Sequence, residues 1–112
     1  MRYGLNEEAV KAIQDVFRSH PAIQEVLLYG SRAKGNFKPG SDIDLTLVGD
    51  GIQTRELAKV EQELDDLLLP YTFDISLFRC LTHPGLVDHI RRVGVTFYRR
   101  EDGRESSQER KV

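Results

Sequence analysis

The sequence has 112 residues and is poor in the features that mark secreted or membrane proteins. There is one cysteine, Cys80, so no disulfide can form within the chain. No apolar run approaches the roughly 20 residues of a membrane span, and the N-terminus lacks the apolar core of a signal peptide. We therefore expect a soluble protein of the reducing cytoplasm.

The chain also lacks an excess of charge of either sign. Charged residues make up 30% of it, yet the formal net charge is only -2. A protein that tracks long DNA or RNA needs a basic surface to neutralise phosphates, so this charge balance disfavours a polymerase-like role on long nucleic acids. The length suffices for one domain with its own core but not for two.

What is present is an alternation of helical and strand patterns. Apolar spacing, Asn6 as a helix cap, and turn residues such as Pro21 and Pro70 set the expected boundaries. Helices are expected at residues 7–19, 31–35, 54–68 and 84–92, and strands at 25–29, 42–48, 72–78 and 95–98. This order predicts an α/β domain over residues 1–100 with a small sheet of three or four strands. Residues 101–112 lack apolar side chains before the last one, which predicts a disordered tail.

A candidate phosphate site follows the first strand. Gly30 and Ser31 stand where an apolar run, residues 26–29, opens into a turn and a short helix. Such a turn offers free backbone N–H groups to phosphate oxygens, and glycine has no side chain to obstruct their approach. The Ser31 hydroxyl adds one more hydrogen-bond donor.

Three aspartates on two expected strands form a candidate metal site. Asp42 and Asp44 are two residues apart, so within a strand both side chains lie on one face, while Ile43, Leu45 and Leu47 lie on the other. Residues 72–78 repeat this alternation and place Asp74 on the polar face. If the two strands are neighbours, the three carboxylates gather, and their mutual repulsion favours a cation. Oxygen-only ligands indicate Mg²⁺ or Mn²⁺.

The ordered set of Gly30, Ser31, Asp42, Asp44 and Asp74 resembles the minimal nucleotidyltransferases (MNT) of the DNA polymerase beta superfamily. The segments Gly-Ser-Arg-Ala-Lys-Gly and Ser-Asp-Ile-Asp-Leu are similar to those of stand-alone bacterial and archaeal members, and the likeness covers roughly residues 5–100. The resemblance implies a mixed sheet with helices packed on one face and the site toward the other. It also implies transfer of a nucleoside monophosphate, with AMP from ATP as the expected case, to a hydroxyl acceptor, with two metal ions.

The resemblance assigns roles to individual residues. Asp42 and Asp44 would bind both ions, and Asp74 would bind the acceptor-side ion and could accept the acceptor's proton. The alternative for each is an ordinary solvated carboxylate. Arg32 and Lys34 follow the Gly-Ser turn and could reach β- or γ-phosphate oxygens, although exposed basic residues on a short helix are commonly just solvated.

A partner is expected because the predicted elements leave no segment of residues 1–100 to form an acceptor pocket. Relatives implied by the resemblance are antitoxins that adenylylate a HEPN-type toxin, or catalytic subunits paired with a separate helical substrate-binding protein. Phe37 and Phe78 are candidate contact residues beside the site, with local packing the alternative for Phe37. A third possibility is a non-catalytic module that neutralises its partner by contact. The intact set of three carboxylates favours an enzyme, most specifically an antitoxin of the first kind.

Overall fold

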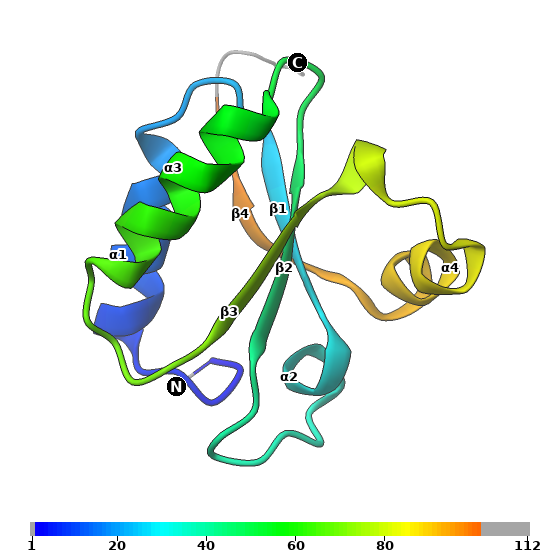
Figure 1. Cartoon of the computed structure of the whole chain (residues 1–112). Coiled ribbons are helices and arrows are strands. Elements are labelled where there is room, and N and C mark those ends of the chain that lie inside the picture. The colour runs from blue at the N-terminus through cyan, green and yellow to red at the C-terminus, as the bar shows by residue number, and fades with distance from the viewer. Residues whose placement is uncertain (1, 102–112) are drawn as a thin grey trace, which may run out of the picture.

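The structure is a computed structural model that describes residues 2–101 (Figure 1). Its helices are α1 (Glu7–Arg18), α2 (Gly30–Lys34), α3 (Thr54–Asp65) and α4 (Pro84–Val93), with a 3₁₀ turn η1 (Phe78–Cys80); its strands are β1 (Glu25–Tyr29), β2 (Ile43–Val48), β3 (Phe73–Leu77) and β4 (Val95–Arg99). The tail predicted to be disordered lies, apart from Glu101, outside the described residues. No helix within residues 2–101 is long and apolar enough to cross a membrane.

The four strands form one mixed sheet in the order β3-β2-β1-β4. Strand β1 runs antiparallel to both β2 and β4, whereas β2 and β3 are parallel. The parallel pair is possible because α3 carries the chain back across the sheet between β2 and β3. The α/β class and the mixed sheet expected from the sequence are therefore confirmed.

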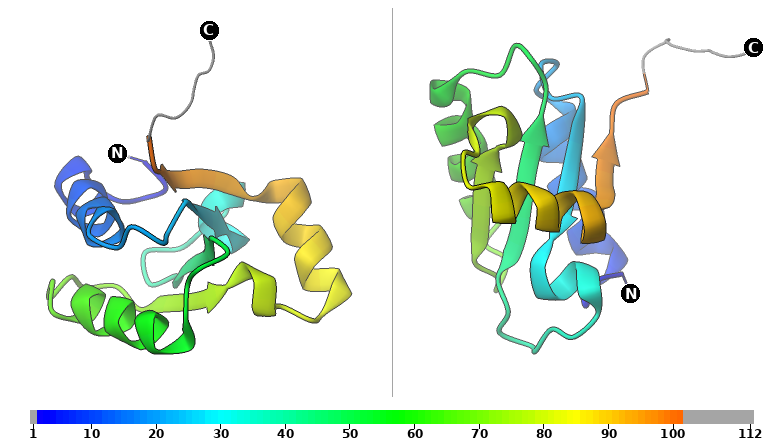
Figure 2. Two further views of the ribbon diagram at one scale, coloured as in Figure 1. Left: turned by 90° about the horizontal axis from the view of Figure 1, so that it is seen from above. Right: turned by 90° about the vertical axis from the view of Figure 1, so that its right-hand side faces the viewer.

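The helices form two unequal layers about the sheet (Figures 1 and 2). The two long helices α1 and α3 lie together on one face, where they enclose the core. Strand residues Val26, Leu28, Leu45 and Leu47 point into this core and meet the fully buried Phe17 of α1. On the opposite side, α2 and α4 contact each other and β1, and they border the site.

One expected boundary differs by three residues, and two that differ by a single residue place a candidate site residue just outside its strand. Helix α3 ends at Asp65 rather than at residue 68, because Leu68 adopts the left-handed region with φ 56°. Asp42 lies just before β2 instead of within it, since the first strand residue is Ile43. Phe78, expected at the end of a strand, begins η1. The other elements begin and end within one residue of the predictions.

Candidate active site

Two of the three aspartates lie side by side on neighbouring strands. The parallel register pairs Asp44 of β2 with Asp74 of β3, and the antiparallel register pairs Asp44 with Tyr29 of β1. Residues paired across adjacent strands point to the same face of a sheet, so these three side chains form one row. In the next row the Ser76 hydroxyl donates to Thr46 Oγ1 at 2.9 Å. This polar face is the one opposite α1 and α3.

Gly30 allows Asp44 to occupy its place in the row. Gly30 begins α2 and has φ 75°, a left-handed conformation that glycine adopts without strain. A Cβ atom at this position would lie 2.3 Å from Asp44 Oδ2, which is well inside van der Waals contact. The glycine is thus required by the carboxylate next to it, in addition to any phosphate contact. Ser31, the next residue, is half-buried at the start of the same helix.

The charge of this row is poorly compensated. Partial burial raises the pKa of Asp44, and the negative charges of Asp74 and Asp42 raise it further, while Arg32 and His89 act in the opposite direction. The pKa of Tyr29 is also raised, first by burial, although a hydrogen bond with Ser76 opposes the shift. A carboxyl whose pKa rises because of like charges stands where a cation would be favourable.

Asp42 and Asp74 complete the predicted set from more open positions. Both are exposed, whereas Asp44 is half-buried. Within residues 2–101, no group of three His, Cys, Asp or Glu side chains is already arranged closely enough to hold a metal ion. The donor set nevertheless fits Mg²⁺ or Mn²⁺, because all three side chains offer carboxylate oxygens and the charges of Asp74 and Asp42 add to burial in raising the pKa of Asp44.

Arg32 does not occupy the position expected of a phosphate ligand. Its side chain is buried, with 2% of the residue exposed, and its guanidinium donates to the backbone oxygens of Ser41 and Tyr3. These bonds engage the guanidinium within the protein, so the structure gives no support to the expected phosphate contact of Arg32. Lys34, at the end of α2, is exposed and keeps its terminal amine free to move.

The sequence interpretation missed two aromatic side chains at the site. Tyr29 is the last residue of the apolar run, which was interpreted only as a strand, and its pairing with Asp44 depends on the sheet order. His89 of α4 meets the Tyr29 ring edge-on, with centroids 6.4 Å apart. It lies near enough to Asp44 for its charge to lower that carboxyl's pKa. The alternation in β1 could have placed Tyr29 on the polar face, but no sequence signal linked His89 to it.

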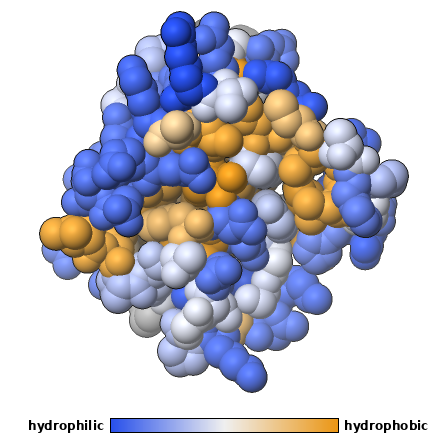
Figure 3. All heavy atoms as spheres, viewed as in Figure 1, coloured by the Kyte–Doolittle hydropathy of each residue, from blue (hydrophilic) through white to orange (hydrophobic). Residues whose placement is uncertain are grey.

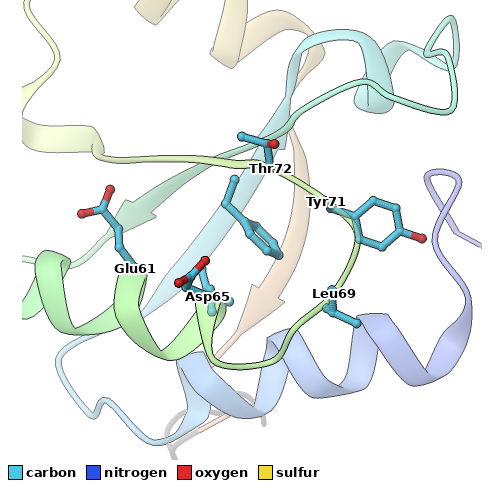
Figure 4. Close-up of a pocket in the computed structure, with 7 residues that line it drawn as sticks. Glu61, Asp65, Leu69, Tyr71 and Thr72 are labelled. Atoms are coloured by element: carbon cyan, nitrogen blue, oxygen red, sulfur yellow. The ribbon is translucent and has the colours of Figure 1, made fainter.

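Two surface hollows are lined by residues other than Asp42, Asp44 and Asp74. One, of about 240 Å³, lies between the end of α3 and the segment entering β3 (Figure 4) and is lined by Glu61, Leu64, Asp65, Leu69, Tyr71, Thr72 and Phe73. In this view the labelled Tyr71 ring extends away from Glu61 and Asp65. It reaches the second, more apolar hollow of about 600 Å³, which is lined by Tyr3, Gly4, Phe37, Pro39 and Tyr71.

Comparison with known families identifies the class to which this fold and carboxylate row belong. The family model for polymerase beta-type nucleotidyltransferases matches residues 11–103, which is most of the chain. The chain therefore belongs to the polymerase beta nucleotidyltransferase family, and the resemblance seen in its motifs is confirmed. A search of curated proteins finds no match.

Solved structures with the same fold include toxin–antitoxin complexes. A toxin–antitoxin structure with AMP-PNP aligns with TM-score 0.66 and 22% identity over 87% of this chain and 76% of that one. A complex of tri-AMPylated Shewanella oneidensis HEPN toxin with MNT antitoxin aligns with TM-score 0.64 and 18% identity, over 86% of this chain and 74% of that one. A candidate nucleotidyltransferase from Sulfolobus solfataricus aligns with TM-score 0.53 and 26% identity, over 85% of this chain and 80% of that one. At these identities the neighbours establish the fold.

Proposed function

We propose that this protein is a metal-dependent nucleotidyltransferase that moves AMP from ATP to a hydroxyl group on a HEPN-type toxin, and so acts as an antitoxin. The observation that supports it best is the in-register pair of Asp44 and Asp74 beside Gly30, in a chain of this family. Like charges on neighbouring strands lower stability, and a purely structural sheet would have no use for them.

The proposed chemistry divides among the site residues. Asp42, Asp44 and Asp74 would hold Mg²⁺ or Mn²⁺, which when bound neutralises triphosphate charge and lowers the pKa of the acceptor hydroxyl. Gly30 and Ser31 would bind the triphosphate through backbone N–H groups and a hydroxyl, with Lys34 reaching outer phosphate oxygens. The acceptor oxygen forms a bond to the α-phosphorus, the bond to the β-phosphate oxygen breaks, and pyrophosphate leaves. Asp74, exposed at the edge strand, would take the hydroxyl proton.

A protein partner is supported by the neighbours and by the surface. Two of the three solved neighbours named above are toxin–antitoxin structures. On the face drawn in Figure 3, hydrophobic side chains gather between α3 and α4 in the middle of the molecule, with hydrophilic ones around them. Phe78 is half-buried next to the sheet, whereas Phe37 packs locally over Arg32, as its alternative interpretation had it. Apolar surface beside an open site suits contact with another chain.

Co-expression with the product of the neighbouring gene tests this proposal. Intact-mass spectrometry should find that protein heavier by one or more AMP groups when wild type, ATP and Mg²⁺ are present. The added mass should vanish with EDTA and with Asp44→Asn or Asp74→Asn. Asp88→Asn is a suitable control, because Asp88 is an exposed carboxylate of α4 that forms an ion pair with Arg92.

The outcomes separate the three candidate functions. A stable complex whose toxin keeps its mass, and is neutralised equally by Asp44→Asn, would support contact without catalysis. Metal-dependent transfer to a small molecule in the presence of a helical partner would support the substrate-binding pairing. Nucleotide transfer unaffected by EDTA would contradict the metal-dependent mechanism altogether.

A further inference from the structure

Arg32 is a buried cation whose hydrogen-bond partners are all backbone oxygens. Its Nε and Nη2 donate to Ser41 O at 3.2 and 2.9 Å, and its Nη1 donates to Tyr3 O at 2.8 Å. Phe37 and Tyr71 lie against the guanidinium, with ring centroids 5.2 and 5.3 Å from Cζ. Burying a charge is unfavourable unless its donors are satisfied, and here the fork of N–H groups is matched to two carbonyls.

The N-terminal turn is shaped to receive this side chain. Tyr3 and Gly4 both have left-handed backbones, with φ 58° and 79°, and the turn is closed by paired hydrogen bonds between Arg2 and Leu5. A Cβ on Gly4 would lie 2.8 Å from Arg32 Nη1 and 2.4 Å from the Phe37 ring. A left-handed tyrosine is a strained conformation that persists only where its surroundings require it. Here it directs the Tyr3 carbonyl to the guanidinium.

The second carbonyl held by Arg32 belongs to the residue before Asp42. Ser41 ends a tight loop in which Ser41 N donates to Lys38 O and Lys38 N donates to Ser41 Oγ, both at 2.9 Å. On the other side of Asp42, Ile43 N donates to Thr72 O at 2.9 Å and begins the pairing with β3. The exposed Asp42 backbone is therefore held at both neighbouring residues, once by Arg32 and once by the sheet.

We propose that Arg32 is a positioning residue that fixes the loop 36–41 and, through the Ser41 carbonyl, places Asp42 opposite Asp44 and Asp74. The second part rests on the proposed function, in which Asp42 holds a metal ion. The role differs from a phosphate contact in its consequence: losing the fork should weaken metal binding even when no nucleotide is present.

Arg32→Lys tests this, because lysine retains the charge but cannot donate to Ser41 O and Tyr3 O in the fixed geometry of a guanidinium. Hydrogen–deuterium exchange should become about tenfold faster at the backbone amides of residues 36–42. Affinity for Mn²⁺ alone should fall about tenfold, as is typical when the support of a metal ligand is lost. Arg91→Lys, the same substitution at an exposed position of α4, should change neither the amide exchange rates nor the affinity for Mn²⁺. Lys34→Gln should lower affinity for ATP with Mn²⁺ while leaving exchange in the loop as in wild type.

Gly4→Ala provides a second variant, because its Cβ disturbs the guanidinium and Phe37 without altering any charge. It should speed exchange in residues 36–42 in the same way as Arg32→Lys. Unchanged exchange and unchanged Mn²⁺ affinity in a folded Arg32→Lys variant, with only ATP affinity reduced, would overturn the proposal in favour of a phosphate contact. If wild type itself bound no Mn²⁺, the proposed metal would be refuted, while loop exchange would still decide whether Arg32 holds the loop.

Discussion

The two faces of β2 carry opposite kinds of side chain, apolar on one and polar on the other. Toward α1 and α3, Ile43, Leu45 and Leu47 are fully or almost fully buried in the apolar core. On the opposite face, toward α4, Asp44 and Thr46 alternate with them and lie beside Asp74 and Ser76 of β3. The same strand thus contributes stability through one face and presents like charges through the other. Function and stability are separated here by the two-residue period of a strand.

The largest effect should come from breaking the apolar face. Leu45→Ala removes a side chain with no exposed surface and leaves a cavity, which should lower the free energy of unfolding by about 2–5 kcal/mol. Urea unfolding followed by circular dichroism measures it. Val48→Ala, at the half-buried end of the same strand, should lose clearly less. A loss below about 1 kcal/mol for Leu45→Ala would contradict the assignment of this face as the main core.

Two glycines with positive φ test whether the position of the Asp44 carboxylate depends on Gly30. Gly30→Ala and Gly35→Ala both place alanine at positive φ, which should cost about 1–2 kcal/mol each. The added Cβ meets Asp44 Oδ2 at Gly30 but has nothing within 4 Å at Gly35. Nucleotide transfer should therefore fall at least 100-fold in Gly30→Ala and survive in Gly35→Ala. Equal activity of the two folded variants would show that the Asp44 carboxylate does not depend on this glycine.

In the helical layer on the core face, a buried histidine lies between two glutamates of α3. His20 is buried after α1, and its Nδ1 and Nε2 lie 2.9 and 2.7 Å from carboxylate oxygens of Glu56 and Glu63 on α3. Burial lowers the pKa of His20, but hydrogen bonds and charge from the two carboxylates outweigh it, so the pKa is raised. Because the folded-state pKa exceeds the unfolded value, this stabilisation is complete below about pH 6.5 and is lost as the pH rises through the folded-state pKa.

His20→Gln should accordingly destabilise the protein by about 1–2 kcal/mol at pH 6 and by less at pH 9. Thermal unfolding at several pH values, with Glu61→Gln as a control on the exposed part of α3, measures this difference. A difference between wild type and His20→Gln that does not change with pH would mean that the imidazole is not protonated in the fold.

Much of the core face was predictable because it depends on local periodicity. Strand β1 was predicted at its observed bounds, and the Asn6 cap is present, with Ala9 N donating to Asn6 Oδ1 at 2.7 Å. Parity also placed Asp44 and Asp74 each on the polar face of its own strand. Their direct pairing required that β2 and β3 be neighbours in parallel register, which no local pattern specifies.

What the sequence could not provide was the direction of long side chains. Arg32 follows the Gly-Ser turn, where a phosphate contact is a reasonable expectation, yet it is drawn inward by the carbonyls of Tyr3 and Ser41. Those carbonyls lie 29 and 9 residues away along the chain, so the competing partners emerge only in the folded structure. His89 is likewise brought to the site by the packing of α4 on β1.

The smallest predicted effect has the opposite sign to that of Leu45→Ala and concerns the adjacent residue. The pKa of Asp44 is raised by burial and by the charges of Asp74 and Asp42. A raised carboxyl pKa means that the ionised group destabilises the fold above the unfolded-state pKa. Asp44→Asn should therefore stabilise the protein in EDTA at pH 7, by up to about 1 kcal/mol, since solvent screens a half-exposed charge.

The pH dependence and the response to metal identify the cause of that gain. Lowering the pH through the folded-state pKa should shrink the difference between wild type and Asp44→Asn, and the difference should vanish below the unfolded-state pKa of about 3.9, where the wild-type carboxyl is protonated in both states. Adding Mn²⁺ at pH 7 should raise the unfolding temperature of wild type more than that of Asp44→Asn, since an ion that binds only the folded state stabilises it. Asp88→Asn, outside the row, should show neither response. An Asp44→Asn variant less stable than wild type in EDTA would mean that hydrogen bonding to this carboxylate outweighs its repulsion by Asp42 and Asp74.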